Sequence, residues 1–339
     1  MTLSRRVPLL AFALLLTLSA AAKDKVETIA IPGGEKGIGF DDLRYSKELG
    51  KLLVPAGRTG NLALVDPATH AVTVIGGFTS ADDPAKGHSV GTTSADVGKG
   101  LIFAGDRSTL ELVVADPASG KILGRTKLAA TPDYVRYVES TNEVWVTEPE
   151  IEKIEVFRLE GNPPKPVPST KINVPGGPES LVIERSRGHA YTNTFGGSTL
   201  AIGQKAHLIF NIWGNGCLGA RGLAIDETKG FLFVACTEGK ISTVYVLSGD
   251  IRGSAAAEPG LDIVDYDAER GHLYVPSGKS ATLSIFGVDV DGKPSLLKSF
   301  PKAGGSCAAT DSKGNVYVCD PKGGKLLVFK DDVPPGAKK

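Results

Sequence analysis

Hydrophobic and polar residues alternate along most of the chain with a period of two, which is typical of half-buried β-strands. One pattern of this kind, a turn followed by an apolar and aromatic strand, recurs seven times. The seven segments read GKLLVPA, KGLIFAG, NEVWVTE, GHAYTNT, GFLFVAC, GHLYVPS and GNVYVCD. Their third residues run from Leu52 to Val316, 264 residues apart in six steps, so the mean period is 44. Strand repeats of this length predict an all-β fold, a seven-bladed β-propeller.

Each repeat has room for four antiparallel strands, named A to D from the centre of the ring outwards. In the first repeat these strands are expected near residues 43–46, 51–55, 61–65 and 71–75. Asp66-Pro67 and Asp116-Pro117 lie between the expected strands C and D of the first two repeats. Proline after aspartate suits a tight turn in which the carboxylate accepts the following amides. Both segments are therefore predicted to be hairpin ends.

The seventh repeat has only three expected strands, near 306–311, 315–319 and 325–329, whereas the other repeats have room for four. The segment Val26–Pro32 forms a further strand pattern with no partner of its own. An unpaired strand edge promotes aggregation, and using 26–32 as strand D of the last blade would remove it. The sequence therefore predicts a ring closed by both ends of the chain.

Composition and charge support this reading and exclude some functions. The 42 glycines and 21 prolines indicate many turns. The chain has 38 basic and 38 acidic residues. A balanced charge gives no electrostatic reason to expect binding to nucleic acid or to anionic lipid, because both need clustered lysine and arginine.

The first 22 residues have the order of a secretory signal peptide. Arg5 and Arg6 precede an apolar run from 7 to about 20, and small residues and then charged ones follow. We expect cleavage after residue 22, one propeller domain over 23–333 and a flexible tail over 334–339. The mature protein is expected to be a periplasmic or extracellular monomer without a transmembrane anchor. An uncleaved anchor and twin-arginine export are alternatives that the sequence leaves open.

The repeats also resemble those of the bacterial YVTN-type β-propeller proteins. The resemblance covers the whole mature chain and is carried by LYVPS, VYVCD, VWVTE, VVADPASGKILG and CLGARGLAIDETKGFLFVAC. It implies a secreted seven-bladed propeller and says little about chemistry, because one fold serves many functions. It also implies histidine near the channel mouth in the second and fifth blades. In this sequence His88 lies two residues before Val90, the equivalent position of the second blade, and Arg221 occupies the equivalent position of the fifth blade.

Residues that precede each strand A should ring one mouth of the central channel, because the D-to-A and B-to-C connections emerge on the same face. Counting eleven residues back from each aligned strand-B residue gives Asp41, Val90, Asp133, Glu179, Arg221, Asp262 and Gly305. Asp42 and His88 lie beside this set. We interpret Asp41, Asp42, His88, Asp133, Glu179, Arg221 and Asp262 as candidate ligand-binding residues.

Two readings of the recurring acids stay open. Asp41, Asp133, Glu179 and Asp262 could hold a hard divalent cation, calcium or magnesium, which prefer oxygen ligands. Alternatively, each acid caps backbone amides at the start of its strand, a structural role that repeated blades would share. Ionised together, the four carboxylates would repel one another, which favours a bound cation, neutralisation by Arg221 or raised pKa values.

The four cysteines are predicted to form two disulfides. Cys307 and Cys319 flank a turn of the last blade and should lie opposite one another on antiparallel strands. Cys217, in a D-to-A connection, and Cys236, at the end of a strand B, should share one face. An even number of cysteines in an exported chain supports both pairs, with free buried thiols as the alternative.

The leading functional hypothesis is a secreted binding module that holds a small polar ligand, a cation or an envelope protein at the acidic mouth. It rests on a rigid ring that presents loops without a recognised nucleophile and base. A second hypothesis is a metal-dependent hydrolase similar to gluconolactonase-type propellers, in which a divalent ion polarises a lactone carbonyl. That resemblance implies asparagine among the metal ligands, and this set has none. A third hypothesis is a structural scaffold at the cell surface.

Overall fold

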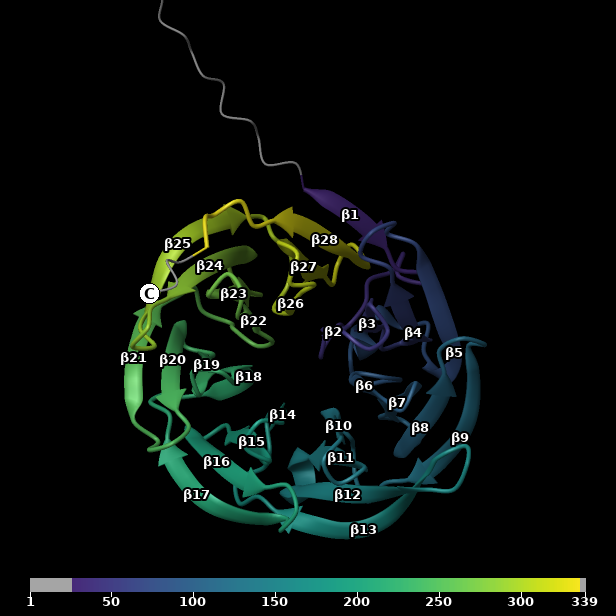
Figure 1. The fold of residues 1–339 in the computed structure, drawn as a ribbon. Helices are drawn as coiled ribbons and strands as arrows, with labels where there is room; N and C mark the ends of the chain where they lie inside the picture. Colours follow the sequence, from purple (N-terminus) through teal and green to yellow (C-terminus); the bar gives the residue numbers. More distant parts are fainter. Residues whose placement is uncertain (1–25, 336–339) are drawn as a thin grey trace, which may run out of the picture.

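The computed structural model describes residues 26–335, and the predicted signal peptide and the end of the predicted tail lie outside them. The described strands form seven four-stranded antiparallel sheets around a central axis (Figure 1). The sequence prediction of an all-β, seven-bladed propeller is confirmed. The only helices among these residues are two short 3-10 turns, η1 (Pro84–Lys86) and η2 (Pro149–Ile151), and none is long and apolar enough to cross a membrane.

The first four blades follow one another along the chain. Blade 1 contains β2 (Arg44–Ser46), β3 (Lys51–Pro55), β4 (Thr59–Val65) and β5 (Val72–Ser80). Blade 2 contains β6 (Ala95–Gly98), β7 (Leu101–Asp106), β8 (Glu111–Asp116) and β9 (Lys121–Lys127). Blade 3 contains β10 (Val135–Val138), β11 (Glu143–Glu148), β12 (Lys153–Glu160) and β13 (Lys165–Asn173). Blade 4 contains β14 (Val182–Glu184), β15 (His189–Thr194), β16 (Ser198–Gly203) and β17 (Leu208–Gly214).

The last three blades complete the ring. Blade 5 contains β18 (Ala220–Asp226), β19 (Phe231–Cys236), β20 (Lys240–Tyr245) and β21 (Ile251–Ala256). Blade 6 contains β22 (Asp265–Asp267), β23 (His272–Ser277), β24 (Thr282–Val288) and β25 (Pro294–Pro301). Blade 7 contains β26 (Ala308–Thr310), β27 (Asn315–Asp320), β28 (Lys325–Lys330) and β1 (Glu27–Ala30). The first strand of each blade lies innermost (Figure 1).

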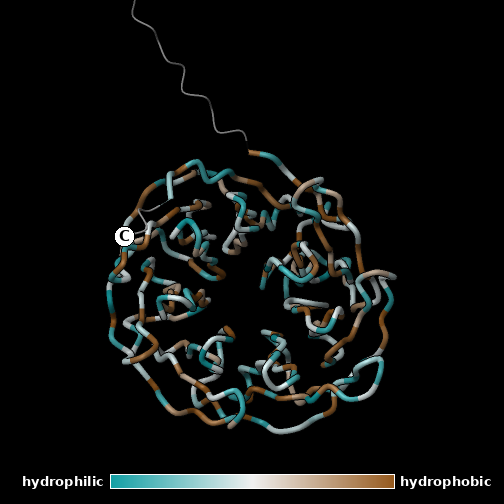
Figure 2. The backbone as a smooth tube through the Cα atoms, viewed as in Figure 1, coloured by the Kyte–Doolittle hydropathy of each residue, from teal (hydrophilic) through white to brown (hydrophobic). Residues whose placement is uncertain are grey.

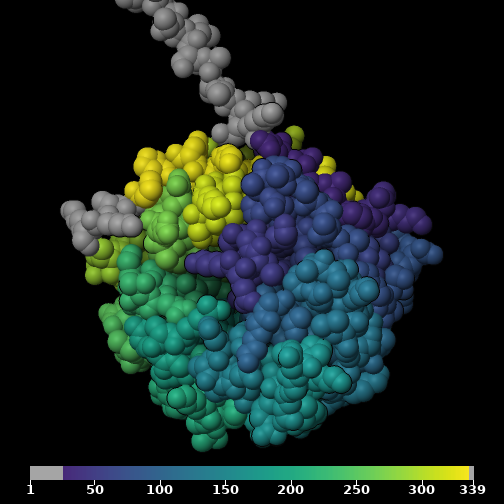
Figure 3. All heavy atoms as spheres, turned by 45° about the vertical axis from the view of Figure 1, so that its right-hand side comes forward, coloured from purple at the N-terminus to yellow at the C-terminus, as the bar shows by residue number. Residues whose placement is uncertain are grey.

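The N-terminal strand closes the ring as predicted. β1 pairs antiparallel with β28, with Ile29 opposite Leu326. The side chains of Ile29 and Ile31 are buried, and the amide of Ile31 donates to the carbonyl of Gly324 over 3.1 Å. Figure 3 shows the first part of the described chain, in purple, lying against the last part, in yellow. Blade 7 therefore joins both ends of the chain in one sheet.

The hydrophobic core is divided into layers between neighbouring blades. Successive side chains of a strand point to opposite faces of its sheet, so each blade packs on both sides. Leu53 and Ile102 belong to the cluster between blades 1 and 2, and Tyr274 and Val316 to that between blades 6 and 7. Accordingly, Figure 2 shows apolar segments in every blade around the ring.

The predicted turn caps and disulfides are confirmed. The Oδ1 atom of Asp66 accepts the amides of Ala68 and Thr69, and Asp116 accepts that of Ala118. Both cysteine pairs are bonded, with Cα separations of 5.2 Å for Cys217–Cys236 and 5.5 Å for Cys307–Cys319. Each disulfide links a connection that enters a strand A to the end of a strand B. The two bonds therefore fix the same face of the disc in blades 5 and 7.

Candidate functional site

The face formed by the D-to-A and B-to-C connections, which we call the entry face, carries a small pocket of about 180 Å³ at the channel axis. This entry pocket collects side chains from every blade. It is lined by Phe40, Asp41, His88, Arg107, Asp133, Tyr134, Glu179, Arg221, Asp262 and Ser306. Six of the seven residues that the sequence analysis proposed as ligand-binding therefore meet in one place.

The polypeptide backbone holds the acids at equivalent positions. The amide of Asp133 donates to Thr147 of β11 over 2.9 Å, and that of Glu179 donates to Asn193 of β15 over 2.9 Å. Each of these acids is thus fixed to strand B of its own blade, next to the innermost strand. The ring repeats this geometry from blade to blade, which is why the carboxylates converge.

Two of the four carboxylates are ion-paired with arginines. The Nη2 atom of Arg107 lies 2.6 Å from Oδ1 of Asp133, and the Nη1 atom of Arg221 donates to Glu179. Arg107 also donates from Nε to the carbonyl of Pro132 over 3.0 Å, and the Arg221 guanidinium lies over the ring of Phe195. Both guanidinium groups are therefore held in place, and both of their acidic partners are compensated.

The other two carboxylates, those of Asp41 and Asp262, have neither an ion pair nor a hydrogen bond among residues 26–335. Burial and the nearby charges of Asp133 and Asp262 raise the pKa of Asp41 well above its usual value. Burial, opposed by Arg221 and reinforced by Asp133 and Glu179, raises the pKa of Asp262 to about 7. The pocket therefore contains two half-buried carboxyl groups that have no ion-pair partner of their own.

The proposed capping role does not match these contacts. Among the described residues, no backbone amide donates to the side chain of Asp41, Asp133, Glu179 or Asp262, whereas the turn acids Asp66 and Asp116 do accept amides. The recurring acids thus point into the pocket rather than back at the chain. Their spacing follows the blades, but their carboxylates are available for interaction with a ligand or with arginine.

The four recurring acids do not form a preformed metal centre either. Within residues 26–335, the only group of three potential ligand residues with ligand atoms within 4.8 Å of one another is Cys217, Cys236 and Glu238. Those two cysteines form a disulfide, so neither offers a thiolate. The four candidate calcium or magnesium ligands share the entry pocket without reaching that proximity.

Asp42 is separated from the entry pocket. Its side chain is 4% exposed and makes a two-pronged ion pair with Arg136, with contacts of 2.5 and 2.8 Å. Burial opposes ionisation of Asp42, but the charge and hydrogen bonds of Arg136 outweigh it and hold the pKa below its usual value. Ser94 donates a further hydrogen bond of 2.6 Å to the carboxylate. These contacts favour a structural role for Asp42 over contact with a ligand in the entry pocket.

The Asp42–Arg136 pair and Tyr134 form a partition inside the channel. The Arg136 guanidinium lies 5.0 Å from the centre of the Tyr134 ring, and Tyr134 lines the cavities on both sides. Arg136 also donates from Nε to the carbonyl of Leu181 over 2.9 Å, which ties the partition to blade 4. The entry pocket therefore opens on the entry face, and the partition forms its inner end.

Two solved structures share this architecture. A chain in a crystal structure of a mitotic checkpoint complex has a TM-score of 0.73 at 10% identity, covering 96% of this chain and 98% of its own. A chain of hydrazine synthase from Kuenenia stuttgartiensis has a TM-score of 0.69 at 12% identity, covering 88% and 96%. At such identities the similarity shows the fold alone. No protein-family model matches the chain, so membership of the YVTN-type group stays a prediction. No curated protein sequence matches it either.

Sequence reasoning missed Arg107, which supplies half of the pocket's positive charge. Arg107 directly follows β7 and belongs to a B-to-C connection, whereas the count along the sequence considered only residues before strand A. Both kinds of connection emerge on the entry face. A second count, of the residue after each strand B, would have placed Arg107 at the same mouth.

Proposed function

We propose that this protein is a binding module whose entry pocket takes a small organic cation, a protonated amine, with Asp41 and Asp262 as its counter-charges. The observation that carries this proposal is the unequal pairing of the acids. Arg107 and Arg221 compensate Asp133 and Glu179, and two carboxyl groups remain uncompensated. A cation that enters the pocket supplies the missing charges and gains charge-assisted hydrogen bonds.

The size and polarity of the pocket support a small organic cation over a drug-sized ligand. Pockets for drug-sized molecules measure about 300–1,000 Å³, and the entry pocket measures about 180 Å³. Phe40 and Tyr134 add aromatic surface beside the carboxyl groups. Aromatic faces attract cations, which adds a second interaction specific to positive charge.

The hydrolase hypothesis has less support. A lactonase of that kind needs a divalent ion held by several oxygen ligands at about 2.0–2.6 Å. Two of the four acids are already engaged by arginines, and no three of the four come within 4.8 Å of one another. The hypothesis of a scaffold or an envelope partner rests on the fold alone, and one fold serves many functions.

Export to an oxidising compartment is part of the proposal. It is supported by the arginine-apolar-small order of residues 1–22 and by two disulfides, which persist in secreted and periplasmic proteins. Disulfides on the entry face in blades 5 and 7 hold the connections next to Arg221 and Ser306. A ligand would therefore meet a largely preorganised pocket.

Calorimetric titration with ethanolammonium at about pH 8 tests the proposal. We expect saturable binding to the wild-type protein and a loss of affinity of about tenfold or more in Asp262→Asn, which removes one counter-charge. Asp291→Asn is the charge-matched control, because Asp291 is exposed on the hairpin between β24 and β25. It should bind like the wild type.

The same titration with calcium chloride and with sodium acetate identifies the ligand class. Acetate should not bind, because the pocket lacks a spare cationic group. Binding of calcium in the absence of amine binding would overturn the organic-cation proposal in favour of a metal site. Equal amine affinity in the wild type and in Asp262→Asn, or no binding at all, would also overturn it.

A further inference from the structure

The two aspartates of the entry pocket that lack an ion pair lie on either side of blade 7. Asp41 precedes β2 of blade 1, and Asp262 precedes β22 of blade 6. Figure 1 shows β26, the innermost strand of blade 7, between these two strands. The ion pairs of the pocket join blade 2 to blade 3 and blade 4 to blade 5. Among residues 26–335, blades 6, 7 and 1 therefore contribute two acids and no arginine to the pocket lining.

Blade 7 has no room for a basic side chain at the equivalent position, which is Gly305. A Cβ atom at this position would lie 2.7 Å from Cδ of Pro321 and 3.0 Å from Sγ of Cys319, whereas nonbonded carbon atoms prefer a separation of about 3.5–4.0 Å. In the described part of the chain, blade 7 adds only the neutral Ser306 to the pocket lining. No side chain of this blade supplies a positive charge between the two aspartates.

The backbone holds both aspartate segments against blade 7. Ile38, three residues before the first aspartate, donates its amide to the carbonyl of Pro321 over 2.8 Å. Ile263, directly after the second aspartate, donates its amide to the carbonyl of Ser306 over 2.9 Å. Each segment is therefore fixed to its own side of the same blade.

The charges of the pocket lining do not balance. The lining contains four acids and two arginines. His88 adds no positive charge at about pH 8, because burial and the charges of Arg107 and Arg221 lower its pKa. Burial and the nearby acids raise the pKa of Tyr134, so this phenol stays neutral too. With all four acids ionised, the pocket has two negative charges in excess, one at each unpaired aspartate.

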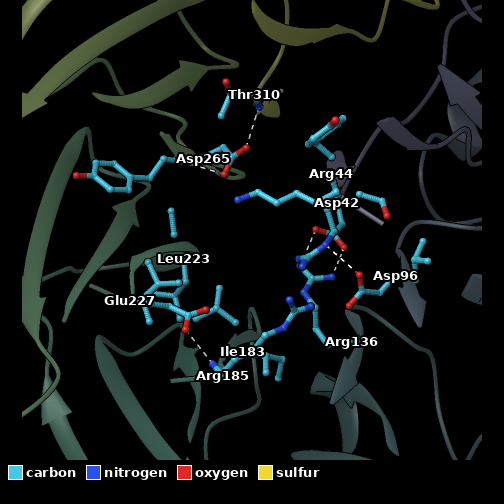
Figure 4. Close-up of a pocket in the computed structure, with 18 of the residues that line it drawn as sticks. Asp42, Arg44, Asp96, Arg136, Ile183, Arg185, Leu223, Glu227, Asp265 and Thr310 are labelled. Carbon is cyan, nitrogen blue, oxygen red and sulfur yellow. Dashed lines mark hydrogen bonds and ion pairs between the residues drawn. The ribbon is translucent and has the colours of Figure 1, made fainter. Parts of the chain in front are cut away.

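Acids beyond the partition have partners, in contrast to these two. The cavity on that side has a volume of about 1170 Å³, and Figure 4 shows its charged residues. Asp96 lies 3.2 Å from Nε of Arg44, and Asp265 accepts the amide of Thr310 over 2.8 Å. The excess of unpaired carboxyl groups is therefore a feature of the entry pocket.

We propose that the ligand of the entry pocket is a short linear diamine in its doubly protonated form, with one ammonium group at Asp41 and the other at Asp262. This inference rests on the function proposed above and names the class of cation. The methylene chain lies along blade 7, beside Ser306. A water molecule takes up about 30 Å³ in the liquid, so the 180 Å³ of the pocket suits a ligand the size of 1,4-diaminobutane.

A calcium or magnesium ion carries the same total charge at a single point. Such an ion needs several oxygen ligands at about 2.0–2.6 Å, but no three of the four acids bring their ligand atoms within 4.8 Å of one another. A diamine keeps its two charges apart and meets each aspartate separately. The arrangement of the acids therefore favours an extended dication over a compact one.

Calorimetric titration at about pH 8 with 1,4-diaminobutane and with 4-amino-1-butanol tests the inference. The amino alcohol has the same length but carries a hydroxyl in place of one ammonium group. The wild type should bind the diamine at least about tenfold more tightly. Asp41→Asn and Asp262→Asn should each reduce this ratio to about twofold or less, because each removes one counter-charge. Asp82→Asn, at an exposed position on the entry face, is the charge-matched control and should keep the wild-type ratio.

A second measurement uses the wild type alone. Titrations at about pH 7 in two buffers that differ in ionisation enthalpy measure the protons released on binding. The diamine should release more protons than the amino alcohol, because both aspartates have raised pKa values and each ammonium group favours ionisation of one of them. Equal wild-type affinity for the two ligands would overturn the diamine assignment. It would leave the organic-cation proposal standing if Asp262→Asn weakens both ligands. Failure of both ligands to bind would overturn both proposals.

Discussion

Arg136→Met is expected to lower the free energy of unfolding by about 3–5 kcal/mol, because it leaves the Asp42 carboxylate buried without its counter-charge. Both side chains of the pair are about 4% exposed, and Arg136 also donates to two backbone carbonyls. The variant therefore loses contacts between blades 1, 3 and 4 at the centre of the disc. Chemical denaturation monitored by circular dichroism measures the change.

Two variants separate the buried pair from an ordinary surface pair. The double variant Asp42→Leu, Arg136→Met should recover most of the loss, since replacing both ions with apolar groups removes the desolvation penalty. Arg125→Met breaks the half-exposed pair with Glu111 and should cost about 1 kcal/mol or less. An Arg136→Met variant as stable as Arg125→Met would contradict the claim that the buried Asp42–Arg136 pair stabilises the centre of the disc.

Removal of the N-terminal strand is expected to lower the free energy of unfolding by as much as Arg136→Met does, or by more. A chain that begins at Gly33 lacks β1, loses the burial of Ile29 and Ile31 and leaves the edge of β28 unpaired. Burial of the two isoleucines alone contributes about 3–6 kcal/mol, and an unpaired strand edge promotes association between chains. Thermal unfolding and size-exclusion chromatography should show a lower midpoint and aggregation, compared with a chain that begins at residue 23.

A matched pair of point variants on β1 controls for the truncation. Ile29→Ala should cost about 2–5 kcal/mol because its side chain is buried. Thr28→Ala, at the neighbouring exposed position, should change stability by about 0.5 kcal/mol or less. A truncated chain that stays monomeric with an unchanged melting midpoint would show that β1 does not hold the ring closed.

The ring and its blades could be predicted because the information is local and repeated. Strand alternation located β3 at 51–55, as the structure has it, and the unpaired N-terminal segment indicated how the ring closes. The outer strand β5 extends to Ser80, five residues beyond the expected end at 75. Gly76 and Gly77 concealed that extension, because glycine has low strand propensity and no side chain to show alternation.

The candidate site could be predicted only in part. The blade repeat gathers Asp41 and Asp262 at one mouth because equivalent positions on a ring share one face. Asp42 was assigned to the same mouth, although successive side chains of an extended chain point in opposite directions. Which acid pairs with which arginine depends on long side chains from different blades, and a one-dimensional pattern does not encode these contacts. These ion pairs decide which carboxyl groups of the entry pocket lack a partner. The proposed function could therefore be derived only from the structure.

The ionisation of Asp262 tests the central claim, that the entry pocket holds uncompensated carboxyl groups for a cation. Carbon-13 NMR of aspartate-labelled protein, with Asp262→Asn to assign the signal, measures the pKa with and without ethanolammonium. We predict a pKa of about 7 for Asp262 in the free protein. The amine should lower that pKa, since a ligand that prefers the ionised form shifts the equilibrium towards it. A pKa near the usual 3.8, unchanged by the amine, would contradict the account.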